Sequence, residues 1–255
     1  MSEIAIPILF YSSLAGLATI TGVFLMRQYQ AWALDHSHYI NSFAAGLILA
    51  LVFFHLMPEA VELSDIAFPA ILIGFFLFFL LENFIVIHSG SEIHYCIDDE
   101  ETVSGSGSHL TRMGIMAFFG LAFHSLIDGI IIGVGFEIDM TIGFLAAVAV
   151  IMHEVPEGIT TFALINRAMP EKANVFSIIV AIATPVGALV SLFFIGGLTD
   201  EIIGILLALA AGTFIYVAAS DLIPETHEKT NFQNLVTFIL GAIFIYVISG
   251  LESFI

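Results

Sequence analysis

Eight long apolar runs dominate the sequence and decide what the chain can fold into. Each run is about as long as the roughly 20 residues that a helix needs to cross a bilayer, and polar residues separate one run from the next. Runs that are apolar on all sides, such as residues 68–81, fit helices in lipid better than strands with one polar face. We therefore predict an all-α membrane protein with eight transmembrane helices, at residues 4–26, 39–60, 66–88, 111–136, 141–165, 174–197, 202–223 and 232–254.

The composition leaves little room for anything outside the membrane. Of 255 residues, 59% are hydrophobic and 11% are charged, against roughly a quarter charged in a soluble domain. We predict a single transmembrane domain over residues 1–255, with the lipid bilayer around it and a flexible cytoplasmic loop at 89–109, where an acidic run precedes a Ser/Gly repeat. The net charge of −18 excludes a nucleic-acid partner and favours cations.

The few basic residues predict the orientation. All five fall on connections or at span ends on the same side of the membrane: Arg27, Arg112, Arg167, Lys172 and Lys229. The positive-inside rule makes that side cytoplasmic. Both termini are then extracytoplasmic, and we expect a multi-pass protein of the plasma (cell inner) membrane.

Two segments far apart in the chain repeat one pattern. An Ala-Ala-Gly triplet at 44–46 is followed nine positions later by His-Leu-Met-Pro-Glu at 55–59, and the triplet at 210–212 is followed nine positions later by Asp-Leu-Ile-Pro-Glu at 221–225. The two segments lie on helices that run in opposite directions. The pattern predicts an inverted repeat of helices 1–3 and 6–8 around a central pair, helices 4 and 5.

The central pair carries the chemistry. His124 and Asp128 share one face of the fourth helix, and His153 and Glu157 share one face of the fifth, because residues i and i+4 project together. Buried carboxylates need a partner, and no lysine or arginine lies within the membrane to pair with them or with Glu154. Two imidazoles and two carboxylates suit a divalent ion such as Zn²⁺, with Fe²⁺, Mn²⁺ and Co²⁺ also acceptable.

These two motifs carry a family resemblance. His-Ser-Leu-Ile-Asp-Gly at 124–129 and His-Glu-Val-Pro-Glu-Gly at 153–158 resemble the paired metal motifs of the ZIP (Zrt/Irt-like) divalent metal transporters. The resemblance implies transport of a divalent ion toward the cytoplasm, with Zn²⁺ preferred and Fe²⁺, Mn²⁺, Co²⁺ or Cd²⁺ as further substrates, and no resident cofactor. It also implies that helices 1, 4, 5 and 6 move as a bundle against helices 2, 3, 7 and 8, and that the latter form a homodimer.

The resemblance further implies how the metal ligands are divided. It places a primary site on His124, Asp128, His153 and Glu157, and an adjacent second site on Ser125, Glu154 and the same two carboxylates. Many prokaryotic members have asparagine at the position of Ser125, and they have glutamate at the position of Thr184. We therefore expect the second site to be weaker in this chain.

A pathway through the protein is predicted from polar residues along the helices. His55 and Glu59 lie at the extracytoplasmic end of the second helix and would collect metal, whereas Asp221 and Glu225 at the cytoplasmic end of the seventh, with Glu82 on the third, would release it. Thr184 on the sixth helix is a further possible pathway residue. These acids could equally be helix-end residues that face water.

Two other functions compete with transport. His153-Glu154-x2-Glu157 resembles a zinc-hydrolase helix, which would make the chain an intramembrane zinc metallohydrolase, but the second ligand is glutamate and Pro156 interrupts the motif. A metal-gated channel or a metal sensor would use the same residues. We predict a transporter and not an enzyme.

Overall fold

The described chain is helical almost throughout. The computed structural model describes residues 2–89, 107–194, 197–227 and 232–252. Its helices are α1 (Ser2–Gln28), α2 (Gln30–Leu51), α3 (Met57–Leu63), α4 (Ala67–Ser89), α5 (Gly107–Ile138), α6 (Met140–Ala168), α7 (Ala173–Phe194), α8 (Asp200–Tyr216), α9 (Ile223–His227) and α10 (Phe232–Glu252). The π-helical turns Val52–Leu56 and Val217–Leu222 join α2 to α3 and α8 to α9, so each pair forms one continuous rod.

Membrane spanning follows from length and apolarity. Seven of the described rods are long and apolar enough to cross a bilayer, and α4 adds a shorter apolar stretch at Ala67–Leu80. The predicted all-α, multi-pass membrane protein is therefore confirmed.

The helix ends extend beyond the predicted spans. The second span was expected to begin at residue 39, but α2 begins at Gln30. Hydropathy marks where the apolar run starts, whereas a helix continues for as long as its backbone bonds are made, and polar side chains in water do not end it. For the same reason the predicted loop at 89–109 is shorter, because Ser89 belongs to α4 and residues 107–109 belong to α5. The rest of that loop lies outside the described residues.

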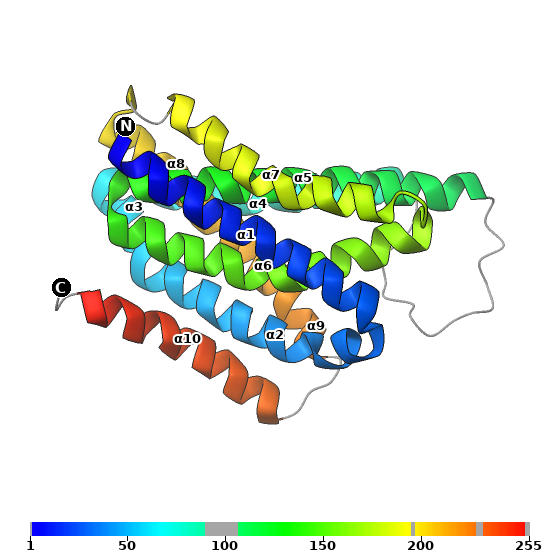
Figure 1. Cartoon of the computed structure of the whole chain (residues 1–255). Coiled ribbons are helices and arrows are strands. Elements are labelled where there is room, and N and C mark those ends of the chain that lie inside the picture. The colour runs from blue at the N-terminus through cyan, green and yellow to red at the C-terminus, as the bar shows by residue number, and fades with distance from the viewer. Residues whose placement is uncertain (1, 90–106, 195–196, 228–231, 253–255) are drawn as a thin grey trace.

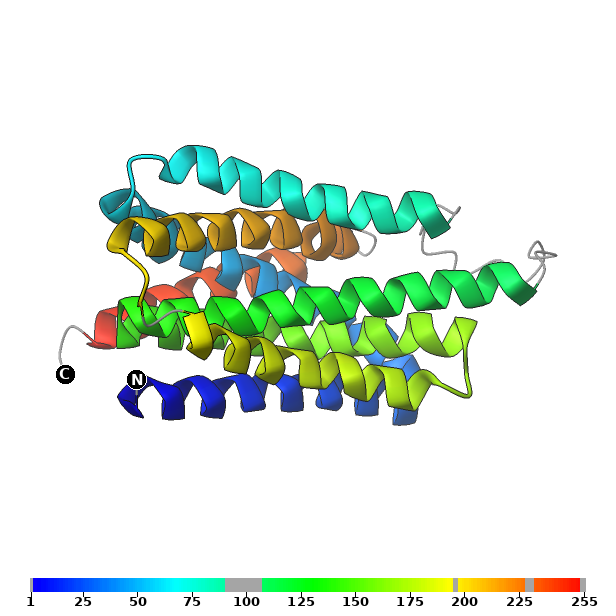
Figure 2. The same ribbon diagram turned by 90° about the horizontal axis from the view of Figure 1, so that it is seen from above.

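The helices pack as two groups, one of α1, α5, α6 and α7 and the other of α2, α4, α8 and α10. Figure 2 shows α4 and α8 on one side, α1 and α7 on the other, and α5 and α6 between them. The most extensive contacts pair α1 with α6, α5 with α7, α2 with α10, and α4 with α8. α1, α5, α6 and α7 are the predicted helices 1, 4, 5 and 6, and α2, α4, α8 and α10 are the predicted helices 2, 3, 7 and 8. Each pair therefore lies within one of the two groups that the family resemblance implied.

In the described part of the chain, acids lie at or beside the turns of one end of the bundle, and the arginines at the ends of α1 and α6 lie at the other end. α1 begins and α10 ends at the same end of the molecule (Figure 1), where α3, α5 and α7 also finish. Arg27 and Arg167 lie in the last turns of α1 and α6, at the opposite end. The charge asymmetry read from the sequence is thus an asymmetry between the two ends of the folded bundle.

The contacts follow the predicted inverted repeat. α2 crosses α10 at Gly46, where a Cβ would lie 2.0 Å from the carbonyl oxygen of Phe238. α8 crosses α4 at Gly212, where a Cβ would lie 2.0 Å from the carbonyl oxygen of Ile71. Only glycine permits so close a backbone approach. A π-helical turn follows each of these glycines within the same rod, so both the helix crossing and the irregular turn recur in the two repeats.

Candidate metal site

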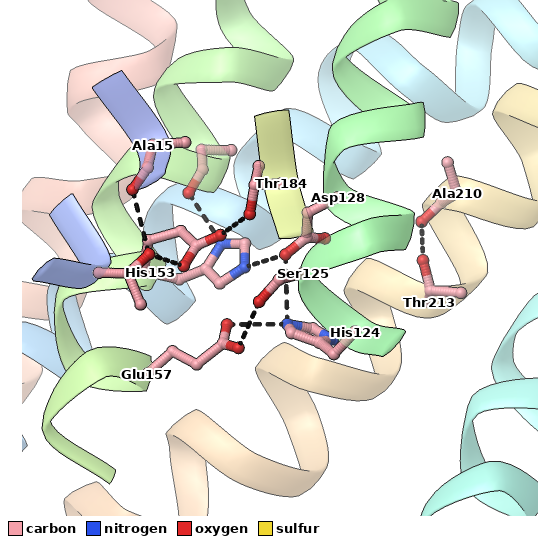
Figure 3. Close-up of polar contacts among 12 residues, drawn as sticks. Ala15, His124, Ser125, Asp128, His153, Glu157, Thr184, Ala210 and Thr213 are labelled. Atoms are coloured by element: carbon pink, nitrogen blue, oxygen red, sulfur yellow. Dashed lines mark hydrogen bonds and ion pairs between the residues drawn. The ribbon is translucent and has the colours of Figure 1, made fainter. Parts of the chain in front are cut away.

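Four side chains converge at the seam between α5 and α6. One potential ligand atom from each of His124, Asp128, His153 and Glu157 lies within 4.8 Å of all the others. Asp128 Oδ2 lies 2.9 Å from His153 Nε2 and 3.3 Å from His124 Nε2, and Glu157 Oε2 lies 3.2 Å from His124 Nε2 (Figure 3). The structure therefore brings together the four residues of the predicted primary site.

The turn between the two helices sets their register. Asp139 caps α6, and its Oδ1 accepts a hydrogen bond of 2.7 Å from the backbone N–H of Thr141. This short turn makes α5 and α6 antiparallel neighbours, so the two i, i+4 pairs face each other at mid-helix.

The hydrogen bonds of His153 fix which ring nitrogen faces the site. Nδ1 lies 3.0 Å from the carbonyl oxygen of Ala149, and a carbonyl only accepts, so Nδ1 must carry the proton. In the neutral ring Nε2 is then a bare acceptor, 2.9 Å from an oxygen of Asp128. Two acceptors this close require a cation or a proton between them.

Glu157 points one oxygen at the same place. Its Oε1 accepts a hydrogen bond of 3.0 Å from the hydroxyl of Ser125. Its Oε2 is buried and makes no hydrogen bond within the described part of the chain, and it faces His124 Nε2 at 3.2 Å. A buried carboxylate oxygen without a hydrogen bond costs free energy unless a cation meets it, so this atom also fits a metal ligand.

Aromatic rings from α4 and α8 cover the four ligands. Phe78 on α4 stands edge-on to His124, with ring centroids 5.0 Å apart, and Phe214 on α8 stands edge-on to His153 at 6.1 Å. Asp128 and His153 are only 1% and 2% exposed. In a buried site with a low dielectric constant, charges interact more strongly than they do in water.

Glu154 lies next to the four ligands but is engaged elsewhere. It is fully buried, and its two oxygens accept hydrogen bonds from Thr19 on α1 at 2.5 Å and Thr184 on α7 at 2.6 Å. It is not one of the four residues whose ligand atoms converge. Of the residues predicted for the second site, Ser125 therefore supports Glu157, whereas Glu154 is bonded to Thr19 and to Thr184, which was predicted as a possible pathway residue.

The predicted pathway residues are placed only in part. His55 and Glu59 line a cavity at the end of the bundle where α1 begins, together with Glu62, Asp139 and Thr141. The side chains of Glu82, Asp221 and Glu225 lie outside the described ones.

Sequence reasoning missed three residues around the site. Thr19 carries no charge and sits in an apolar run, so its bond to Glu154 left no signal in a search for metal ligands. Phe78 belongs to the phenylalanine-rich stretch 75–79, which is typical of packing or lipid-facing surface, and Phe214 lies in the apolar run of the seventh predicted helix. One signal for Thr19 was available, since residues 18–22 and 183–187 share the pattern Ala-Thr-x-x-Gly.

Comparison with known proteins identifies the family. A family described as ZIP Zinc transporter matches residues 88–249, which contain both motifs and more than half of the chain. Mouse (Mus musculus) "Zinc transporter ZIP10" is 32% identical over 148 residues, which cover 53% of this chain and 18% of that protein. "Zinc transporter zipt-7.2" of Caenorhabditis elegans is 29% identical over 150 residues, which cover 54% of this chain and 32% of the relative. The match to mouse "Zinc transporter SLC39A7" is 29% over 154 residues, or 56% of this chain and 32% of that protein.

The chain thus spans less than a third of the length of these curated relatives. The family match itself rests on the segment that holds the two His/carboxylate motifs, the turn between them and the helices that follow. With that match over most of the sequence and an all-helical membrane fold around the converging ligands, the chain belongs to the ZIP zinc transporter family.

Proposed function

We propose that the chain carries a divalent metal ion across the membrane, with Zn²⁺ as the preferred substrate. The observation that carries this proposal is the convergence of four ligand atoms within 4.8 Å, in the middle of helices long enough to span a bilayer. The names of the relatives, all zinc transporters, support transport rather than hydrolysis.

The ligand atoms favour a metal ion that is borderline between hard and soft and that accepts four ligands. Two imidazole nitrogens and two carboxylate oxygens match the ligand types and number of a tetrahedral Zn²⁺ site. The carboxylates of Asp128 and Glu157 offset the two positive charges, so the loaded site is neutral in a dry environment. Fe²⁺, Mn²⁺, Co²⁺ and Cd²⁺ are competing substrates because they accept the same ligand types.

We propose that metal enters from the end where α1 begins and leaves at the basic end. The cavity that contains His55 and Glu59 opens there, and Glu62 and Asp139 add negative charge to its wall. Such a mouth concentrates cations from solution. The positive-inside rule then makes this end extracytoplasmic, so that both termini are extracytoplasmic and transport runs toward the cytoplasm.

Three further properties belong to the proposal. The chain acts as one transmembrane unit over residues 1–255 in the plasma membrane, because its helices pack as a single bundle around the seam. It works without a resident cofactor. It forms a homodimer, as the family resemblance implies, and size-exclusion chromatography with light scattering in detergent would measure this.

Reconstituted protein in liposomes tests the function. Vesicles loaded with a zinc-sensitive dye should show saturable uptake with the wild-type protein, and His153→Ala should abolish most of it, because the metal loses one of four ligands. His36→Ala is the matched control, since that histidine is half-buried on α2, away from the four ligands, and stacks on Trp32. Equal loss from both variants would contradict the proposed site.

The same vesicles separate transport from the competing functions. A carrier saturates with metal concentration and shows no unitary currents, whereas a metal-gated channel shows them in planar bilayers. A sensor binds metal without moving it. Binding by the purified wild-type protein without uptake would therefore replace the transport proposal by a sensing one.

A further inference from the structure

The contacts of Glu154 bring together two helices that the four-ligand cluster does not use. Thr19 on α1 lies 2.5 Å from one carboxylate oxygen, and Thr184 on α7 lies 2.6 Å from the other. All three side chains are fully buried. A hydroxyl carries one proton, and that of Thr19 lies 3.2 Å from the carbonyl oxygen of Ala15 as well, so the shorter contact to Glu154 is the stronger one. The carboxylate accepts from both threonines.

The two threonines occupy equivalent places in the inverted repeat. Each is the second residue of an Ala-Thr-x-x-Gly segment, at 18–22 and 183–187. The backbone carbonyl of Thr19 packs on Gly158 of α6, where a Cβ would lie 2.1 Å away, and that of Thr184 packs on Gly129 of α5, where a Cβ would lie 1.9 Å away. Both hydroxyls are therefore held by backbone contacts at the glycines that end the two metal motifs.

The two metal motifs differ at their second residue, which is Ser125 in one and Glu154, the residue that contacts the threonines, in the other. His124 corresponds to His153, Asp128 to Glu157, and Ser125 to Glu154. Ser125 gives its hydroxyl to Glu157, which is a ligand. The chain thus has two donor threonines, one from each repeat, and a single carboxylate that receives both.

Holding both oxygens of Glu154 affects which metals the site accepts. The two charge-assisted hydrogen bonds, which belong to the stronger class, hold Glu154 outside the four converging ligands. To bring this carboxylate in as a further ligand of the same ion, at least one of the two bonds must break. Zn²⁺ is satisfied by four ligands and has no need to do so. Mn²⁺ prefers oxygen ligands in octahedral geometry and gains from a further carboxylate.

We propose that Thr19 and Thr184 are a pair of positioning residues, one from each repeat, that hold Glu154 apart from the four ligands and so favour four-coordinate Zn²⁺ over oxygen-preferring ions. This inference rests on the proposed metal transport. It adds a role for α1, which lies outside the segment that matches the family.

Hydroxyl removal tests the proposal. Thr19→Val and Thr184→Val keep the shape of the side chain and delete the donor, whereas the two serine variants keep the donor. We expect each valine variant to bind Mn²⁺ about tenfold more tightly relative to Zn²⁺, the order of one hydrogen bond to a charged group, in calorimetry on purified protein and in competition for uptake. The serine variants should retain the wild-type preference.

Matched controls isolate the hydroxyls of this pair. Thr21→Val deletes a hydroxyl on the exposed side of α1 that bonds only to Leu17 among the described hydrogen bonds, and it should leave the preference unchanged. In a Glu154→Gln background, Thr19→Val should add little, because the carboxylate on which it acts is gone. If the valine variants do not fold, Thr19→Ala and Thr184→Ala take their place.

The outcomes distinguish this inference from the proposed function. Wild-type protein that neither binds nor carries Zn²⁺ would refute the transport function. A functional wild type whose valine variants keep the same Zn²⁺/Mn²⁺ preference would refute the positioning pair alone. An equal change in the valine and serine variants would assign the effect to packing, and it would also overturn the proposal.

Discussion

Asp128 is the residue whose substitution tests the charge balance of the site most directly. Its Oδ2 reaches both imidazoles, at 2.9 Å and 3.3 Å, whereas Glu157 Oε2 reaches only one, at 3.2 Å. Asp128→Asn keeps the size of the side chain and removes one negative charge. The loaded site then holds an ion of charge +2 against one carboxylate, with only 1% of residue 128 exposed to solvent.

The expected magnitude follows from the burial of the pair. Removing one partner from a buried ion pair costs about 3–5 kcal/mol, and a factor of ten in affinity corresponds to about 1.4 kcal/mol. We therefore expect Asp128→Asn to weaken Zn²⁺ binding by about two to three and a half orders of magnitude and to abolish uptake at low metal concentration. Glu157→Gln should weaken it less, because that side chain meets one histidine instead of two.

Isothermal titration with a competing chelator measures this affinity in detergent, and thermal unfolding shows whether each variant is folded. Asp200→Asn serves as the control, because Asp200 is an exposed acid in the first turn of α8. A folded Asp128→Asn protein that binds Zn²⁺ within threefold of the wild type would refute the reasoning that two carboxylates balance the ion.

Three other predictions follow from the structure. Zn²⁺ uptake should rise as the pH rises from about 5 to about 7, because histidine, with an ordinary pKa near 6.5, ligates only when neutral; a flat profile of dye-reported uptake would contradict histidine ligation. In a cysteine-free background, a membrane-impermeant reagent added outside intact cells should label Asp200→Cys but not Lys172→Cys, and the reverse labelling would invert the proposed orientation. Gly158→Ala should destabilise the protein by about 1–3 kcal/mol, the usual cost of overpacking, because its Cβ would lie 2.1 Å from the carbonyl oxygen of Thr19, whereas Gly197→Ala, with nothing within 4 Å, should leave the melting temperature unchanged.

Much of the fold could be predicted because lipid imposes a simple constraint. A chain in hydrocarbon must satisfy every backbone group internally, so each long apolar run becomes a helix. The ends of these helices could not be predicted in the same way. α2 continues back to Gln30 through residues such as Asp35 and His36, since helix formation in water depends on backbone bonding that hydropathy does not measure.

The same contrast holds at the site. His124, Asp128, His153 and Glu157 could be found because ionisable groups in an apolar helix are costly and therefore informative. Thr19 could not be found in this way, because a threonine in a membrane helix normally bonds to its own backbone, as Thr21 does and as Thr19 itself does through Ala15. Its contact with Glu154 depends on how α1 packs against α6, which is a tertiary fact.

The irregular turns in the two long rods have a consequence for motion. Val52–Leu56 is followed by Pro58 and Val217–Leu222 by Pro224, and each proline removes a backbone donor next to a turn that already departs from α-helical bonding. Each rod is therefore easiest to bend at this point. Because the two rods belong to opposite halves of the inverted repeat, these bending points lie at equivalent places near opposite ends of the bundle. The two rods carry different side chains at corresponding positions, such as His55 and Asp221.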